Sequence, residues 1–166
     1  MGTTVVAGLL NEKILSLAHV GDSRAYLYRQ GELTLLTDDH SWVQEQVSAG
    51  ILTEEEAKTH PLKNVVTRAL GGGPSVSPDL REMEFLKGDA FLFCSDGLTT
   101  MLSDEEIRDS VSASQGKKPE ALCEALVELA NSKGGVDNIT VVFVRIKDSA
   151  DEVTGETAAL ADVPLE

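Results

Sequence analysis

Residues 90–98 read AFLFCSDGL, and this stretch decides the fold. Its first five residues, 90–94, are apolar without any alternation between apolar and polar side chains. Such a run predicts a β-strand that is covered on both faces at the centre of a sheet. Because Asp96 follows this run almost directly, we expect a carboxylate at the end of the most buried strand.

Two other aspartates occupy similar places beside apolar runs. Asp22 follows the run 14–20, and Asp137 precedes the run 139–146. Each turn taken singly is explained by aspartate bonding its own following backbone. Together they favour a second interpretation, because antiparallel strands begin and end at the same edge of a sheet. The three carboxylates are therefore expected to converge, and a buried charge must be paired, here by a cation.

The donor atoms of such a cluster select the cation. Carboxylate oxygens without histidine or thiolate partners favour Mg²⁺ or Mn²⁺ over zinc or copper. The sequence lacks the D-x-D-x-D-G loop of calcium sites. Divalent ions of this kind suit phosphate chemistry, because they acidify a bound water and neutralise phosphoryl oxygens.

The remaining elements follow from periodicity and capping residues. Further strands are predicted at 3–10, 14–20, 24–28, 32–36, 80–86 and 139–146. Helices are predicted over 42–49, from the capping box at 53–56, over 64–70, from the capping box at 103–106, and from Pro119 to Gly134. The last of these helices carries an apolar stripe that should pack on the sheet, formed by Ala121, Leu122, Ala125, Leu126 and Leu129.

Composition limits the classes of protein and partner. With 166 residues, 42% of them hydrophobic, the chain is long enough for one domain with a core. The net charge of −14 argues against a nucleic-acid or anionic-membrane partner. No apolar stretch reaches the roughly 20 residues that cross a bilayer, and a cytoplasmic protein is expected. Cys94 and Cys123 are expected to be buried, inert thiols.

Five stretches, all in the same order, resemble those of metal-dependent protein phosphatases, in particular the bacterial branch of the type 2C serine/threonine group. They are HVGDSRAYL at 19–27, LTDDHS at 36–41, NVVTRALG at 64–71, FCSDGL at 93–98 and DNIT at 137–140. The resemblance covers residues 2–146 and implies an α+β fold, an antiparallel β-sandwich flanked by helices in α-β-β-α order.

The resemblance also implies a site and a reaction. Asp96 and Asp137 match carboxylates that bind a pair of catalytic Mn²⁺ or Mg²⁺ ions, and Asp22 matches one that holds a third metal together with Asp96. Gly97 and Asn138 match residues beside these ligands. The implied reaction is hydrolysis of phosphoserine or phosphothreonine in a protein substrate of a serine/threonine kinase, by a metal-activated water.

Domain boundaries follow from the same comparison. A catalytic domain is expected over 1–146, with a flap subdomain at about 38–73 that carries His40, Ser41 and Arg68. Arg68 is expected to meet either a phosphate or one of the acidic side chains. Residues 147–166 are acidic and without periodicity, which predicts a disordered tail. The oligomeric state is left open.

One departure from the family pattern affects activity. Family members carry an upstream Asp-Gly-x-Gly-Gly motif whose aspartate bridges the two metals, and no stretch of this sequence matches it. We therefore expect a domain that lacks its N-terminal part and that is inactive or nearly so by itself. The alternative is a non-catalytic, phosphatase-like domain that binds phosphoproteins or a regulatory partner.

Overall fold

The computed structural model describes residues 1–73 and 75–147 and divides the chain into two compact units. Unit 1 is formed by Met1–Ser23 and Thr37–Glu84, and unit 2 by Arg24–Leu36 and Phe85–Glu166. The single domain over 1–146 with a flap at 38–73 stays a prediction. Apart from Lys147, the predicted tail lies outside the described residues.

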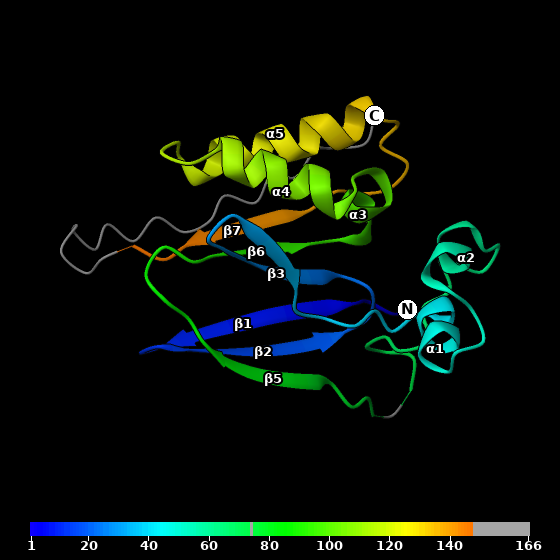
Figure 1. Cartoon of the computed structure of the whole chain (residues 1–166). Coiled ribbons are helices and arrows are strands. Elements are labelled where there is room, and N and C mark those ends of the chain that lie inside the picture. The colour runs from blue at the N-terminus through cyan, green and yellow to red at the C-terminus, as the bar shows by residue number, and fades with distance from the viewer. Residues whose placement is uncertain (74, 148–166) are drawn as a thin grey trace. The chain divides into compact units, whose positions relative to one another are not determined.

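Unit 1 contains an antiparallel sheet of three strands in the order β1-β2-β5 (Figure 1). Its strands are β1 (Val5–Asn11), β2 (Ile14–Val20) and β5 (Asp79–Glu84). Glu12, with φ of 52°, makes the tight turn between β1 and β2, so the predicted hairpin is confirmed. Leu15 and Leu17 of the central strand β2 are buried.

Two short helices follow in unit 1, α1 (Trp42–Ser48) and α2 (Glu54–Thr59). The predicted capping box of α2 is present, because Thr53 and Glu56 hydrogen-bond to each other's backbone N–H groups. Trp42 stacks on His60, with ring centroids 4.9 Å apart. This contact ties the first turn of α1 to the residue that ends α2.

The predicted helix over 64–70 is wrong. Val66 and Leu70 instead form isolated β-bridges, to Ser41 and Thr3 respectively. The N–H of Leu70 donates to the carbonyl of Thr3 at 2.8 Å, and the reverse bond is 3.0 Å long. Valine and threonine are stiff, β-favouring residues, so the segment forms β-bridges where other backbone groups offer partners.

Unit 2 contains an antiparallel sheet of four strands in the order β4-β3-β6-β7. The strands are β3 (Arg24–Arg29), β4 (Glu32–Leu35), β6 (Ala90–Cys94) and β7 (Val141–Arg145). The run at 90–94 thus forms an internal strand, as predicted, and Phe91 and Leu92 are each 1% exposed. Antiparallel sheets with separate helices confirm the α+β class.

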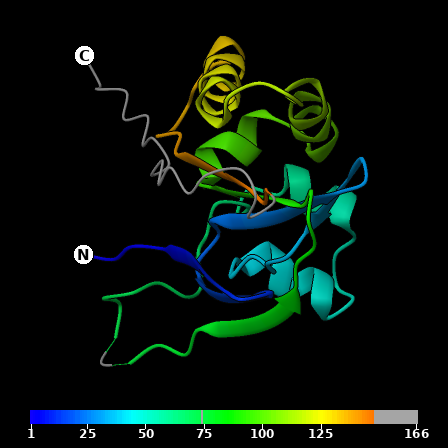
Figure 2. The same cartoon turned by 90° about the vertical axis from the view of Figure 1, so that its left-hand side faces the viewer.

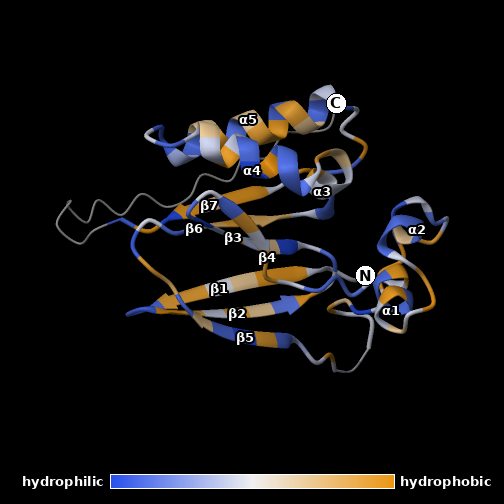
Figure 3. Cartoon of the chain, viewed as in Figure 1, coloured by the Kyte–Doolittle hydropathy of each residue, from blue (hydrophilic) through white to orange (hydrophobic). Residues whose placement is uncertain are grey.

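Helices α3 (Asp96–Met101), α4 (Asp104–Ala113) and α5 (Pro119–Ser132) belong to unit 2. Figure 2 shows α4 and α5 side by side along one face of the unit 2 sheet, and Figure 3 shows hydrophobic residues on α5 and the strands beneath it. The predicted capping box of α4 is present, and α5 begins at Pro119 as predicted. The sequence prediction missed α3, which is only six residues long.

The buried stripe of α5 differs from the predicted one. Ala121 and Ala125 are exposed, and the buried residues are Leu122, Cys123, Leu126, Val127 and Ala130. The helix is rotated so that the larger side chains enter the core, because burying a methyl group of alanine stabilises less than burying a valine. Cys94 and Cys123 are both buried, as predicted, and neither belongs to a disulfide within the described residues; burial raises the pKa of the Cys123 thiol. Within the described residues, no helix combines the length and apolarity needed to cross a bilayer.

A buried ion pair fixes the turn that leads into β6. Asp89 is 2% exposed and accepts hydrogen bonds from Arg29 Nε at 2.8 Å and Arg29 Nη2 at 2.7 Å. The N–H of Leu86 also donates to Asp89, at 2.7 Å. Burial alone would raise the pKa of Asp89, but these hydrogen bonds outweigh burial and hold the pKa below its ordinary value.

Replacing this carboxylate should destabilise the protein in a pH-dependent way. We expect Asp89→Asn to lower the free energy of unfolding by about 2–3 kcal/mol at pH 7, because two charge-assisted hydrogen bonds are lost. The folded-state pKa lies below the unfolded one, so this contribution is complete above about pH 4 and disappears as the pH falls through the folded-state pKa. Urea denaturation of both proteins at pH 7 and at pH 3 measures the difference.

The exposed carboxylate of Asp109 on α4 provides the control. Asp109→Asn should change the free energy of unfolding by less than about 1 kcal/mol at either pH. A gap between Asp89→Asn and the unchanged protein that is as large at pH 3 as at pH 7 would contradict the ion-pair explanation.

Candidate metal centre

Asp96 is the first residue of α3 and is separated from the end of the buried strand β6 by Ser95 alone. Its side chain is half-buried. Ser95 precedes it in an extended conformation (φ −75°, ψ 165°) and occupies the N-cap position, yet its side chain makes no cap hydrogen bond. The Ser95 hydroxyl is used elsewhere.

Ser95 joins the start of α3 to the loop between α5 and β7. Its Oγ donates to the carbonyl of Asn138 at 2.9 Å and accepts from the N–H of Thr140 at 3.0 Å. The N–H of Ser95 donates to the carbonyl of Thr140 at 3.1 Å. Three hydrogen bonds therefore hold the loop that carries Asp137 against the residue that precedes Asp96.

Gly97 lets the same loop approach α3 closely. A Cβ atom at Gly97 would lie 2.3 Å from the carbonyl oxygen of Asn138 and 3.3 Å from that of Asp137. Real Cβ atoms do not come as close to oxygen as 2.3 Å, so a side chain here would displace the loop. The absence of a side chain at Gly97 thus leaves room for the Asn138 carbonyl next to Asp96.

Asp137 lies in this loop and is exposed. Its Oδ1 accepts a hydrogen bond from the N–H of Asn138, the next residue, at 2.7 Å. Within unit 2, the fold therefore brings the segments of Asp96 and Asp137 together. Two carboxylates fit Mg²⁺ or Mn²⁺, which take one or two carboxylates and fill their remaining positions with water or phosphate oxygens.

Asp22 lies in unit 1, in the turn after β2. Gly21 precedes it with φ of 117°, a conformation that glycine adopts readily. Ser23 follows it, and the Ser23 and Thr4 hydroxyls are 2.9 Å apart. The convergence of Asp22 with the two unit 2 aspartates stays a prediction. Within residues 1–73 and 75–147, no three His, Cys, Asp or Glu side chains form a group that could hold a metal ion.

The three residues predicted for the flap have well-defined partners. Ser41 caps α1, and its Oγ accepts from the N–H of Gln44 at 3.3 Å. Arg68 Nη1 donates to Asp79 Oδ1 at 2.8 Å, so Arg68 meets an acidic side chain, one of the two predicted outcomes. The other oxygen of Asp79 lies 3.1 Å from Nε2 of His40.

The role of Asp79 was not predicted from the sequence. Its only signal was its position next to the predicted strand 80–86. The hydrogen bond with His40 is the main cause that lowers the pKa of Asp79, with a further contribution from Arg68. Asp79 is therefore a carboxylate that links the segment of His40 to that of Arg68.

His19 packs beside His40 as a neutral ring. The two ring centroids are 4.7 Å apart, with the ring planes at 41°. His19 is 2% exposed, and burial together with the neighbouring His40 lowers its pKa. By hydrogen-bond geometry, neither ring nitrogen of His19 has a partner among the described residues.

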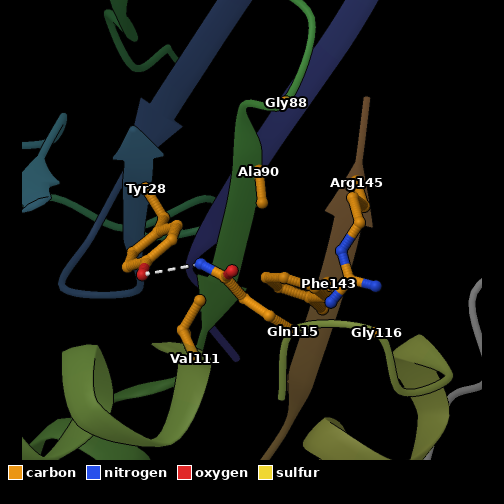
Figure 4. A pocket seen from close by; sticks show the side chains of 8 residues that line it. All are labelled: Tyr28, Gly88, Ala90, Val111, Gln115, Gly116, Phe143 and Arg145. Atoms are coloured by element: carbon orange, nitrogen blue, oxygen red, sulfur yellow. Dashed lines mark hydrogen bonds between the residues drawn. The ribbon is translucent and has the colours of Figure 1, made fainter. Parts of the chain in front are cut away.

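A pocket of about 250 Å³ lies elsewhere in unit 2 (Figure 4). It is lined by Tyr28, Gly88, Ala90, Val111, Gln115, Gly116, Phe143 and Arg145. Gln115 donates to the Tyr28 hydroxyl at 3.4 Å, and Arg145 donates to the carbonyls of Lys117 and Ser114. Ala90 begins β6 and Asp96 follows its end, so this pocket is separate from the aspartates.

Comparisons with known proteins show the family to which the chain belongs. The family model described as protein phosphatase 2C matches residues 1–139. Protein phosphatase PhpP of Streptococcus pneumoniae is 42% identical over 152 residues, which are 92% of this chain and 61% of PhpP. The chain therefore spans about three fifths of that relative.

Solved structures show the same likeness. The Mycobacterium tuberculosis serine/threonine phosphatase PstP/Ppp superposes with a TM-score of 0.84 at 43% identity, covering 89% of this chain and 61% of that one. The catalytic domain of PstP in complex with two manganese ions gives a TM-score of 0.79 at 42% identity, covering 89% of this chain and 60% of that one. These likenesses confirm the predicted fold class. With a family model matched over most of its length, the chain belongs to the protein phosphatase 2C family.

Proposed function

We propose that this chain carries acidic residues of a metal-dependent protein serine/threonine phosphatase. Asp96 and Asp137 would hold Mn²⁺ or Mg²⁺, and Asp22 would hold an accessory ion. The observation that carries the proposal is the junction in unit 2, where Ser95 bonds to Asn138 and Thr140 and so joins the segments of the two aspartates.

The chemistry that bound Mn²⁺ or Mg²⁺ supplies is the acidification of a water molecule and the neutralisation of phosphoryl oxygens. The protein's own part is to hold carboxylates of the right kind in fixed positions. Asp96 is fixed because it starts a helix directly after a buried strand, and Asp137 because its carboxylate accepts from the next backbone N–H. Such preorganisation lowers the cost of ordering the site when a ligand binds.

The substrate class rests on the relatives. A solved structure at 43% identity is a serine/threonine phosphatase, and a second was solved in complex with two manganese ions. We infer a phosphoserine or phosphothreonine protein as the substrate, produced by an opposing serine/threonine kinase in the cytoplasm. The surplus of acidic residues, with a net charge of −14, favours this over a nucleic-acid phosphodiester substrate.

Removing either unit 2 carboxylate should weaken metal binding. We expect Asp96→Asn and Asp137→Asn each to lower Mn²⁺ affinity at least about tenfold, since even the loss of a residue that only supports a ligand costs 10–100-fold. Isothermal titration calorimetry with MnCl₂ measures the affinity. The chain alone is expected to hydrolyse a phosphothreonine peptide little or not at all, and any turnover measured in parallel should require Mn²⁺ and should be lost in both variants.

Asp109→Asn is the matched control, because it removes one exposed carboxylate from unit 2 without touching the junction. It should leave affinity and turnover unchanged. Equal Mn²⁺ affinity in all four proteins would contradict the proposed metal site. Binding of the phosphothreonine peptide that persists without Mn²⁺ and is not followed by turnover would favour the non-catalytic, phosphoprotein-binding alternative.

A methyl group at Gly97 should disturb the junction. Alanine is normally favoured over glycine in a helix by about 1 kcal/mol, but here the clash with the Asn138 carbonyl should reverse the sign. We expect Gly97→Ala to lower the free energy of unfolding by about 1–3 kcal/mol and to shift the NMR resonances of the Asn138 and Ile139 amides. Denaturant unfolding and a ¹⁵N correlation spectrum measure both effects.

Gly72 offers a glycine with space around it. The nearest heavy atom to a Cβ at Gly72 is 3.7 Å away, so Gly72→Ala should be neutral within about 0.5 kcal/mol. If Gly97→Ala is as stable as Gly72→Ala and the resonances of residues 137–140 do not move, the position of this loop does not require glycine at residue 97.

A further inference from the structure

His40 uses every polar group it has to hold neighbouring segments of unit 1. Its N–H donates to the carbonyl of Gly21 at 2.7 Å, and its carbonyl accepts from the N–H of Thr67 at 2.8 Å. In its side chain, Nδ1 accepts from the N–H of Gly21 at 3.1 Å, and Nε2 lies 3.1 Å from Asp79 Oδ2. His40 is 2% exposed and is therefore a buried residue that connects the segments of Gly21, Thr67 and Asp79.

The hydrogen bonds also fix the tautomer of this ring. A backbone N–H can only donate, so Nδ1 of His40 accepts and the ring proton lies on Nε2. Nε2–H then donates to Asp79, whose other oxygen is held by Arg68 at 2.8 Å. The ring is therefore clamped between a main-chain donor of Gly21 and a carboxylate.

The opposite side of the Gly21–Asp22 turn is closed by Thr4. A Cβ at Gly21 would lie 2.3 Å from Thr4 Cγ2, so the turn has no room to move in that direction. Thr4 also lies within hydrogen-bond distance of Ser23. Asp22 thus lies between one residue held by His40 and another held by Thr4.

We propose that His40 is a positioning residue, which fixes the Gly21 backbone through Nδ1 and so directs the carboxylate of Asp22. The proposal rests on the metal-binding role proposed above for Asp22. In this role His40 acts on the turn that carries Asp22, whereas from the sequence His40 was assigned only to the flap. Asp79 braces the ring from Nε2, and the Arg68 segment is connected to the turn through Asp79.

The competing explanation is that His40 only fills space beside His19. Two variants separate the explanations, because Asn places its side-chain oxygen near the position of Nδ1, whereas Gln reaches toward the position of Nε2. Gln is closer to His in volume. Packing alone therefore makes His40→Gln the milder change, and positioning through Nδ1 makes His40→Asn the milder change.

Hydrogen exchange of the Gly21 amide, measured by NMR on the full chain without metal, reads the contact directly. We expect His40→Gln to speed this exchange about five- to tenfold, as for loss of one hydrogen bond, and His40→Asn to change it less than about twofold. The amide of Leu17 in β2 reports whether the unit 1 sheet stays folded. The proposal would be overturned if the Gly21 amide exchanged faster in His40→Asn than in His40→Gln, or if both variants sped its exchange equally.

Asp79 supplies a second pair of variants should His40→Gln unfold the sheet. Asp79 is 52% exposed, so its replacement does not disturb a core. Asp79→Asn keeps an oxygen that accepts from Nε2–H and should leave Gly21 exchange unchanged, whereas Asp79→Ala removes the brace and should speed it about threefold or more. Identical Gly21 exchange in Asp79→Ala and Asp79→Asn would count against the clamp.

Paramagnetic broadening of the Asp22 and Ser23 amide signals by Mn²⁺ reads the consequence for metal binding. The Mn²⁺ concentration that gives half-maximal broadening should rise about tenfold in His40→Gln and less than about twofold in His40→Asn. If the unchanged protein shows no broadening at Asp22, the metal role proposed for Asp22 fails. The positioning role is then decided by the Gly21 exchange rates alone.

Discussion

Irregular backbone must find hydrogen-bond partners, and the segments that carry the acidic residues of this protein depend on that constraint. A buried N–H or carbonyl group without a partner costs free energy comparable to a lost hydrogen bond. In unit 2, Ser95 satisfies the loop at 138–140. In unit 1, His40 satisfies the turn at Gly21. In each unit, one polar residue therefore binds backbone groups beside the candidate aspartates.

Close contacts also explain why positions 21 and 97, at these two junctions, are glycines. Gly21 has a positive φ and faces Thr4, while Gly97 has ordinary helical geometry and faces the Asn138 carbonyl. The first glycine is required by backbone conformation as well as by space, and the second by space alone. The close neighbour is the Thr4 side chain at Gly21 and a backbone carbonyl at Gly97, and the carboxylates beside these glycines are exposed or half-buried.

Local signals explain why much of the fold was predictable. The apolar run at 90–94, the capping boxes at Thr53 and Ser103, and Pro119 at the start of α5 all act within a few residues. The predictions that failed depended on distant partners. The segment 64–70 forms β-bridges because Thr3 and Ser41 are available to it, and α5 buries Cys123, Val127 and Ala130 in place of Ala121 and Ala125.

In the candidate site, too, residues with local sequence signals were predicted and residues that depend on distant partners were not. Asp22, Asp96 and Asp137 were identified by their turns and by the family resemblance, and Asp137 does accept from the following N–H. Asp79 escaped prediction because its partners, His40 and Arg68, are 39 and 11 residues away. The task of His40 was hidden for a similar reason, since its neighbours Asp39 and Ser41 do not show which backbone group Nδ1 meets.

The proposed function depends on Asp96 and Asp137 binding the same metal centre. Crystals of the chain grown with MnCl₂, with data collected at the manganese absorption edge, would locate the bound metal. We expect an anomalous peak within coordination distance of carboxylate oxygens from both Asp96 and Asp137. Manganese bound at other carboxylates, with neither of these two residues among the ligands, would contradict it.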